Sequence, residues 1–173
     1  MNDHALAIVA GIHLVAVVSW LGLIINSALV YLPVEQKLDR EGLLATFPGF
    51  QKRTLWISLS TVIVLIVAGT ILTTFNENDA GPSHIFSNPW STLIFIKHIL
   101  VAGMLIFQGW SVFVIHPRLI KILRNLHAAG LNLPDEVEKN VRLLLRRTRV
   151  FYVLSAILGV GVLMIIGVVL TLY

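Results

Sequence analysis

The sequence contains no cysteine and few charged residues. Without cysteine, the chain has no disulfide bonds, no thiolate metal sites and no iron–sulfur clusters. Charged residues make up 13% of the 173 residues, which is about half of what a soluble domain carries. Hydrophobic residues make up 57%, and the mean hydropathy is +0.86. This composition predicts an integral membrane protein.

Four apolar stretches are present, and each is long enough to cross the hydrocarbon core as a helix, which takes roughly 20 residues. They cover residues 5–32, 55–75, 90–115 and 150–173. The first stretch is too long for the core of a signal peptide, and no Lys or Arg precedes it, so we expect it to be retained. The sequence therefore predicts an all-α fold, residues 1–173 forming one antiparallel four-helix bundle in the membrane.

The basic residues lie almost entirely on one side of these stretches. Twelve of the thirteen fall between stretches one and two or between stretches three and four, and Lys97 lies inside the third stretch. The remaining connections carry no Lys or Arg. Because positive charge marks the cytoplasmic side, we expect both termini on the outer side of the inner (plasma) membrane. Topology explains the charge, so nucleic-acid binding is not expected.

The long basic connection, about residues 117–148, has helical patterns of its own. Pro117 predicts a kink or an end of the third span. The sequence RLIKILRNLHAAG then predicts an amphipathic helix closed by Gly130, and Asn132 is a candidate cap for the fourth helix. We expect the basic faces of both pieces to lie against anionic lipid headgroups.

Two histidines lie inside the apolar stretches, and they predict a metal or haem site. His13 is eight residues into the first stretch and His98 eight residues into the third. At 1.5 Å per residue, both rings lie roughly 12 Å below the outer boundary. Two imidazoles at one depth on parallel spans suit the two axial positions of a haem iron. The alternative for each ring is a hydrogen bond between helices.

Neighbouring residues are compatible with a cofactor pocket. Gly69 and Gly167 lie six to seven residues from the outer ends of their spans, and Trp20 shares the helix face of His13. The glycines are equally typical of close helix packing in membranes. Lys97 is expected either to pair with a haem propionate or another anion, or to extend to the outer surface.

The remaining histidines have less specific surroundings. His116 lies at the cytoplasmic end of the third span without a histidine partner on the first, so we expect it to form an interfacial hydrogen bond. His4 and His84 are both expected outside, either simply exposed or as a weak copper or zinc site.

Two segments resemble known membrane families. IHLVAVVSWLGLIINSALVYLP resembles the first span of the copper resistance D family, and IKHILVAGMLIFQGWSVFVIHPRL resembles a later span of that family. The first segment is also similar to the bacterial membrane protoporphyrinogen oxidase, a four-span haem b protein, with Trp20, Gly22, Leu32 and Pro33 matching its motif and no arginine after Pro33. These resemblances imply a small histidine-bearing bundle that handles copper, haem or electrons.

Taken together, these features favour one haem b between His13 and His98, used for electron transfer with quinone or an external redox partner. Copper binding or transport is an alternative, although Met1, Met104 and Met164 do not cluster in the sequence. A structural subunit of a larger respiratory complex and a protoporphyrinogen oxidase-like enzyme are further alternatives.

Overall fold

A computed structural model describes residues 3–75, 89–128 and 135–172. These residues form long helices, and four of the helical stretches are long and apolar enough to cross a membrane. The first is built from α1 (Asp3–Asn26), a π-helical turn η1 (Ser27–Tyr31) and α2 (Leu32–Glu35). The prediction of four helices that are long and apolar enough to cross a membrane is confirmed.

The second stretch is α3 (Arg40–Thr74), and it begins well before the predicted span. Asp39 caps its first turn, because the side chain accepts a hydrogen bond of 2.9 Å from the backbone N–H of Gly42. The predicted boundary at residue 55 marked where the apolar run begins. The helix itself continues toward the basic connection, where polar residues face water or headgroups.

The third stretch combines α4 (Pro89–Trp110), a second π-helical turn η3 (Ser111–Ile115) and α5 (His116–Ala128). Pro117 therefore does not end the helix. Each π turn lies just before a proline, Pro33 in α2 and Pro117 in α5. A proline ring clashes with the carbonyl four residues earlier, and the wider turn displaces that carbonyl. This gives a physical reason for both turns, since π turns are rare.

The fourth stretch is α6 (Asp135–Leu172), and its buried face repeats with the heptad spacing of a coiled-coil seam. The buried residues on this face are Val141, Leu145, Thr148, Tyr152, Ser155, Gly159 and Val162. Small and polar residues occupy the centre of this seam, whereas exposed Ile157 and Met164 face outward. This distribution suits lipid, which is as apolar as leucine and lets small residues bring helices together.

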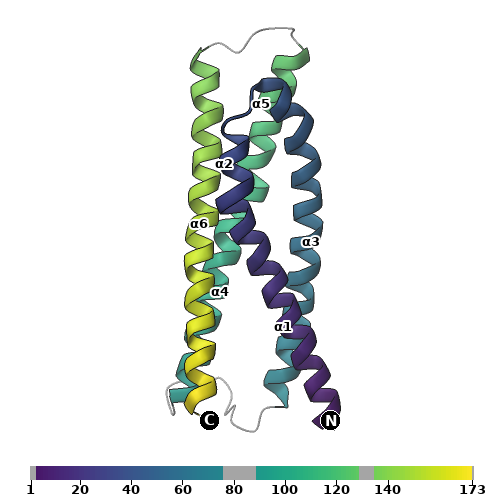
Figure 1. Ribbon diagram of the computed structural model, residues 1–173, viewed down its shortest axis with the longest axis vertical. Helices are drawn as coiled ribbons and strands as arrows, with labels where there is room; N and C mark the ends of the chain where they lie inside the picture. Colours follow the sequence, from purple (N-terminus) through teal and green to yellow (C-terminus); the bar gives the residue numbers. More distant parts are fainter. Residues whose placement is uncertain (1–2, 76–88, 129–134, 173) are drawn as a thin grey trace.

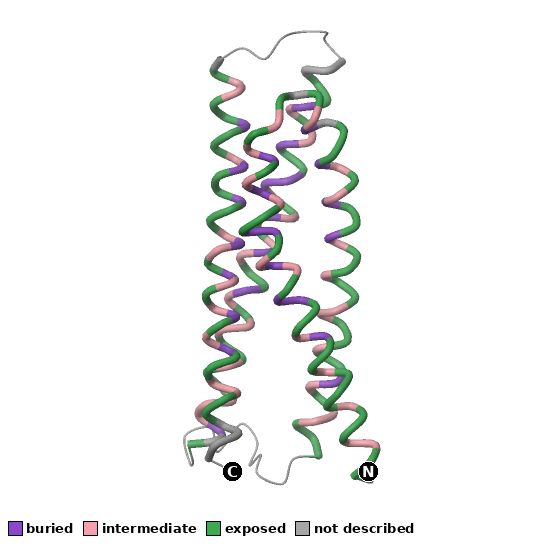
Figure 2. The backbone as a smooth tube through the Cα atoms, viewed as in Figure 1, coloured by how far each residue is buried: buried purple, intermediate pink, exposed green. Residues whose placement is uncertain are grey.

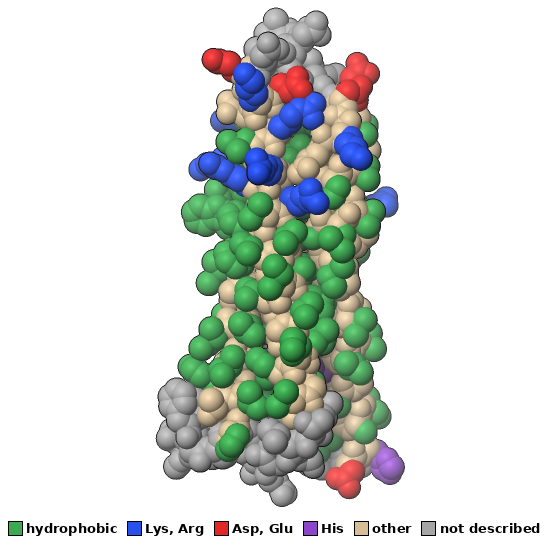
Figure 3. All heavy atoms as spheres, turned by 60° about the vertical axis from the view of Figure 1, so that its left-hand side comes forward, with side chains coloured by type: hydrophobic (Ala, Val, Ile, Leu, Met, Phe, Trp, Pro, Cys, Tyr) green, Lys and Arg blue, Asp and Glu red, His purple; other side chains and the backbone are tan. Residues whose placement is uncertain are grey.

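The chain ends and the basic residues lie at opposite ends of the molecule. Figure 1 shows the N- and C-termini at the same end, which we call the terminal end. Figure 3 shows Lys and Arg gathered at the other end, the basic end, and a hydrophobic surface between the two. As predicted, α5 is amphipathic, with Leu119 and Leu123 buried and Arg118 and Arg124 exposed. Gly130 and Asn132 lie outside the described residues.

Two groups of buried apolar side chains hold the bundle together. One lies at mid-length, and its buried members are Trp20, Leu21, Ile24, Ala28, Leu32, Met104, Tyr152 and Val162. The other lies toward the basic end and contains Leu43, Phe47, Leu119, Leu123, Val141 and Leu145. Figure 2 shows fewer buried residues toward the terminal end, where α1 packs mainly on α3 and α4 packs mainly on α6.

Candidate functional site

A cavity of about 420 Å³ lies between the helices toward the terminal end, and all four spans line it. Its size falls within the range of ligand sites, roughly 300–1,000 Å³. His13 and Trp20 line it from α1, Gly69 from α3, and Lys97 and His98 from α4. The structure thus brings together five of the six site residues predicted from the sequence.

The sixth predicted residue, Gly167, is not among the residues that line the cavity. It is exposed on α6, and a Cβ atom placed there would meet no atom within 4 Å. On α6 the cavity is lined instead by Gly159, Val162 and Ile166. Gly167 directly follows Ile166, so its position is turned about 100° around the helix. Gly167 lies at the expected depth along its span, but it does not face the cavity as expected.

His98 is held in one orientation by its own helix. Its Nδ1 atom lies 2.7 Å from the carbonyl oxygen of Ile94, one turn earlier. A carbonyl only accepts, so Nδ1 carries the proton and donates it to this bond. This leaves Nε2 as the ring atom able to bind a metal. Donation of the other ring N–H to a carbonyl is typical of metal-binding histidines.

His13 packs against the backbone of α3. A Cβ atom at Gly69 would lie 3.3 Å from Cε1 of His13, so the glycine leaves room for the ring. Nδ1 of His13 is buried and lies beside the backbone of Leu65, one turn before Gly69. The α3 backbone thus positions the ring of His13 at the wall of the cavity.

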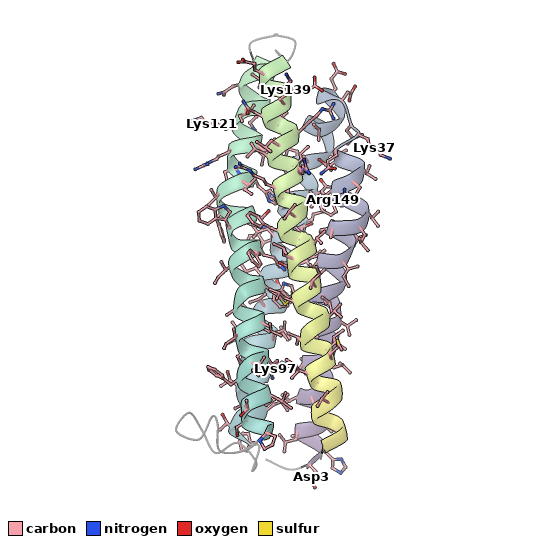
Figure 4. The ribbon with its side chains drawn as sticks, turned by 90° about the vertical axis from the view of Figure 1, so that its left-hand side faces the viewer. Asp3, Lys37, Lys97, Lys121, Lys139 and Arg149 are labelled. Atoms are coloured by element: carbon pink, nitrogen blue, oxygen red, sulfur yellow. The ribbon has the colours of Figure 1, made fainter. Side chains whose placement is uncertain are left out.

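Lys97 places a cation in the same cavity. Figure 4 shows it on α4, far from the labelled cations of the basic end. It is half-buried and lies close enough to His13 for an electrostatic interaction. A cation among mostly apolar walls is suited to an anionic group on a bound molecule.

Hydrogen bonds close the cavity on the side of the basic end. The indole N–H of Trp20 donates to Oγ of Ser58 at 3.2 Å and to Oε1 of Gln108 at 3.3 Å. These three side chains come from α1, α3 and α4, and Trp20 lines the cavity; we call the cluster the cavity floor. The sequence indicated that Trp20 shares a face with His13, but neither partner was anticipated.

Met104 is a cavity residue that the sequence analysis set aside. It is buried, and it lines the same cavity as His13 and His98. The four-residue step from Leu100 and the seven-residue step from Lys97 put it on the inward face of α4. The sequence alone does not show that Met104 and His13 line the same cavity, because the two residues lie on different spans.

His116 lies apart from the cavity, near the basic end. It is buried, its Nε2 atom lies 3.2 Å from Oγ of Ser111, and its ring meets that of Phe47 edge-on at 5.4 Å. Its hydrogen bond is therefore internal. His4 is exposed on α1, and His84 lies outside the described residues. Among the side chains that the structure describes, no three of His, Asp and Glu gather as a metal site.

No family model, curated protein or solved structure matches the chain.

Proposed function

We propose that the protein binds one b-type haem between His13 and His98 and transfers electrons in the membrane. The observation that carries this proposal is that both rings, from separate spans, line one cavity. Two axial imidazoles need no third protein ligand, so a pair of histidines suffices for this cofactor.

The haem would supply an iron that accepts and returns one electron. The chain's own residues would hold it, with the ring of His13 and Nε2 of His98, which the bond from Nδ1 to Ile94 leaves available, as its ligands. Lys97 would pair with a propionate. The apolar walls would exclude water, and partner and haem would exchange electrons at the terminal end. A quinone or an external redox protein would be that partner.

The proposal includes an orientation. In an antiparallel bundle with both termini on the outer side of the inner (plasma) membrane, the basic end contacts cytoplasm and anionic headgroups. Cysteines introduced at Asn78 and Asn125 should react with an impermeant thiol reagent from opposite sides of the membrane. The cysteine-free background makes this assay direct. Reaction of both from the same side would contradict the orientation.

The test of the haem is an absorption spectrum. Protein purified from haem-replete cells should show the reduced spectrum of low-spin, six-coordinate haem b, with one haem per chain. Both His13→Ala and His98→Ala should remove it or convert it to high-spin, because the iron loses an axial ligand. His4→Ala and His116→Ala are the controls and should keep it. A colourless wild-type protein would refute the haem.

Copper binding is a second candidate, and the position of Met104 favours it. Imidazole and thioether ligands together suit Cu(I), and His13, His98 and Met104 line one cavity. Met104→Leu keeps the volume nearly constant and separates the two candidates. It should lower Cu(I) affinity at least tenfold if copper is the ligand and should leave a bis-histidine haem spectrum unchanged.

A further inference from the structure

Polar side chains fill the interior between the cavity floor and the basic end. On the first span, Ser27, Tyr31 and Glu35 follow one another at four-residue steps. Ser27 and Glu35 are each 1% exposed. On α6, Thr148 and Ser155 are both fully buried. Ser and Thr are common between helices in lipid, but a buried carboxyl in line with them is costly and points to a function.

The two polar faces meet inside the bundle. The π turn η1, which begins at Ser27, packs against α6. Tyr31 interacts electrostatically with both Glu35 and Tyr152, which joins the first span to α6. Ser111 begins the second π turn, which also packs against α6. Toward the terminal end, the next polar group is the Trp20–Ser58–Gln108 cluster of the cavity floor.

The buried hydroxyls differ from the exposed ones in their hydrogen bonds. The exposed hydroxyls of Ser60, Thr70 and Thr73 on α3 each donate to a carbonyl of their own helix at 2.8–2.9 Å. The hydroxyls of Ser27, Thr148 and Ser155 have no hydrogen-bond partner in the described residues, and Nε2 of Gln108 has none either. A buried polar atom left unpaired costs about 1–3 kcal/mol.

Glu35 lies at the basic end of this series. Its Oε1 atom accepts a hydrogen bond of 3.0 Å from the hydroxyl of Thr46. Oε2 is buried, and the carboxyl interacts with the nearby hydroxyl of Tyr31. No basic side chain forms an ion pair with this carboxyl in the described part of the chain. Arg142 bonds instead to Glu138 and to the backbone carbonyl of Gln36.

Buried water would pair the hydroxyls and the Gln108 amide that have no protein partner in the described residues. Internal waters typically make about three hydrogen bonds to polar groups that would otherwise be unpaired. Waters placed among these hydroxyls would join them into one hydrogen-bonded series. Such a series, with a carboxyl at one end, is the arrangement that moves protons inside membrane proteins.

We propose that the basic half of the bundle holds a hydrated polar path that carries protons from the basic end, through Glu35, to the floor of the cavity. A proton from water at the basic end binds Oε2 of Glu35. It then passes from oxygen to oxygen by the making and breaking of O–H bonds alone, so each proton that enters releases one at the floor. The path does not depend on which group the cavity binds.

The water is tested with single cysteines at neighbouring positions. Ser27→Cys and Ala28→Cys place a thiol at sites that are 1% and 0% exposed, one polar and one apolar. A small hydrophilic thiol reagent reacts with the thiolate, which forms in water. In vesicles with the reagent at the basic end, Ser27→Cys should react at least tenfold faster than Ala28→Cys. Ser155→Cys should also react.

Equal reaction at positions 27 and 28 overturns the path, whether both are fast or both are slow. Fast reaction at both would report local opening of the helices, and slow reaction at both would report a dry interior.

The proton is tested by infrared spectroscopy. Acidification should produce a carboxylic acid band that Glu35→Gln removes and Glu41→Gln, the exposed neighbour on α3, retains. The band should shift within minutes of transfer to D₂O. Absence of a Glu35 band at every pH where the protein stays folded, or a band that resists deuteration, overturns the path. Neither measurement uses haem, so the path and the proposed function fail independently.

Discussion

The two halves of the bundle differ in what lies between the helices. In the terminal half, up to the Trp20–Ser58–Gln108 cluster, the space between two helix pairs is a cavity with mostly apolar walls. In the basic half, buried side chains fill the interior, and several of them are polar. The exterior is hydrophobic along the middle of the molecule, and Lys and Arg gather on it at the basic end. The comparison teaches that the two halves differ in their interiors: one holds space, and the other holds packed apolar and polar side chains.

The largest expected effect is on stability, and it should differ between a buried and an exposed phenylalanine. Phe47 is fully buried in the basic half, so Phe47→Ala should cost about 3–5 kcal/mol of unfolding free energy. Phe113 is 73% exposed, so Phe113→Ala should stay within about 0.5 kcal/mol. Thermal unfolding in detergent measures both. Similar losses would mean that the basic half is not the packed part of the molecule.

The second expected effect tests whether the terminal half is a binding site. Gly69→Leu places a side chain against His13, and overpacking of this kind costs about 1–3 kcal/mol. Bound cofactor should therefore fall at least tenfold, while the helix itself gains propensity. Gly167→Leu, at the exposed glycine, should bind normally. Cofactor content per chain is the measurement, and unchanged content in Gly69→Leu would place the ligand elsewhere.

The third effect concerns the boundary between the halves. Trp20→Phe removes the single indole N–H that Ser58 and Gln108 share at the cavity floor, a hydrogen bond worth about 0.5–1.5 kcal/mol. The melting temperature should fall. Trp56→Phe, at a site that is 61% exposed, should leave it nearly unchanged. If both substitutions behave alike, the floor is not a structural boundary.

The smallest effect concerns the charge in the cavity. If Lys97 neutralises a propionate, Lys97→Met should lower the haem midpoint potential, because the reduced state loses a nearby positive charge. An interaction of about 1 kcal/mol corresponds to roughly 40 mV. Redox titration measures the shift. An unchanged potential would indicate that Lys97 acts elsewhere.

The four helices were predictable because lipid imposes a long apolar run on every span. The gathering of His13 and His98 around one cavity was also open to prediction, since helix rise converts sequence position into depth. The rotation of each helix about its own axis, which decides the face on which a residue lies, could not be predicted. Gly167 was placed at the right depth but on the wrong face, and Met104 was set aside although its face points inward.

The polar interior was harder still to foresee. Glu35 follows an apolar run and precedes a basic segment, so its sequence context is that of a headgroup-level residue. Its burial depends on contacts with α3 and α6 and on the π turn that precedes it. No residue type predicts a π turn by itself. In this chain a proline lies two residues after each π turn, and this spacing could indicate such turns in similar sequences.

The π turn in the first span lets that helix absorb a change in length that composition would not reveal. A π turn fits one more residue into a turn than an α-helix does, so deleting one residue within Ser27–Tyr31 would restore an α-helical turn and keep Glu35 facing the interior. Deleting Val34 instead, in the α-helical stretch that follows, would swing Glu35 about a quarter turn out of the interior, because each residue of an α-helix turns the chain by 100°. Two chains that align with a single gap in this span could therefore share a fold and a cavity, and the place of the gap would decide whether the acid faces inward.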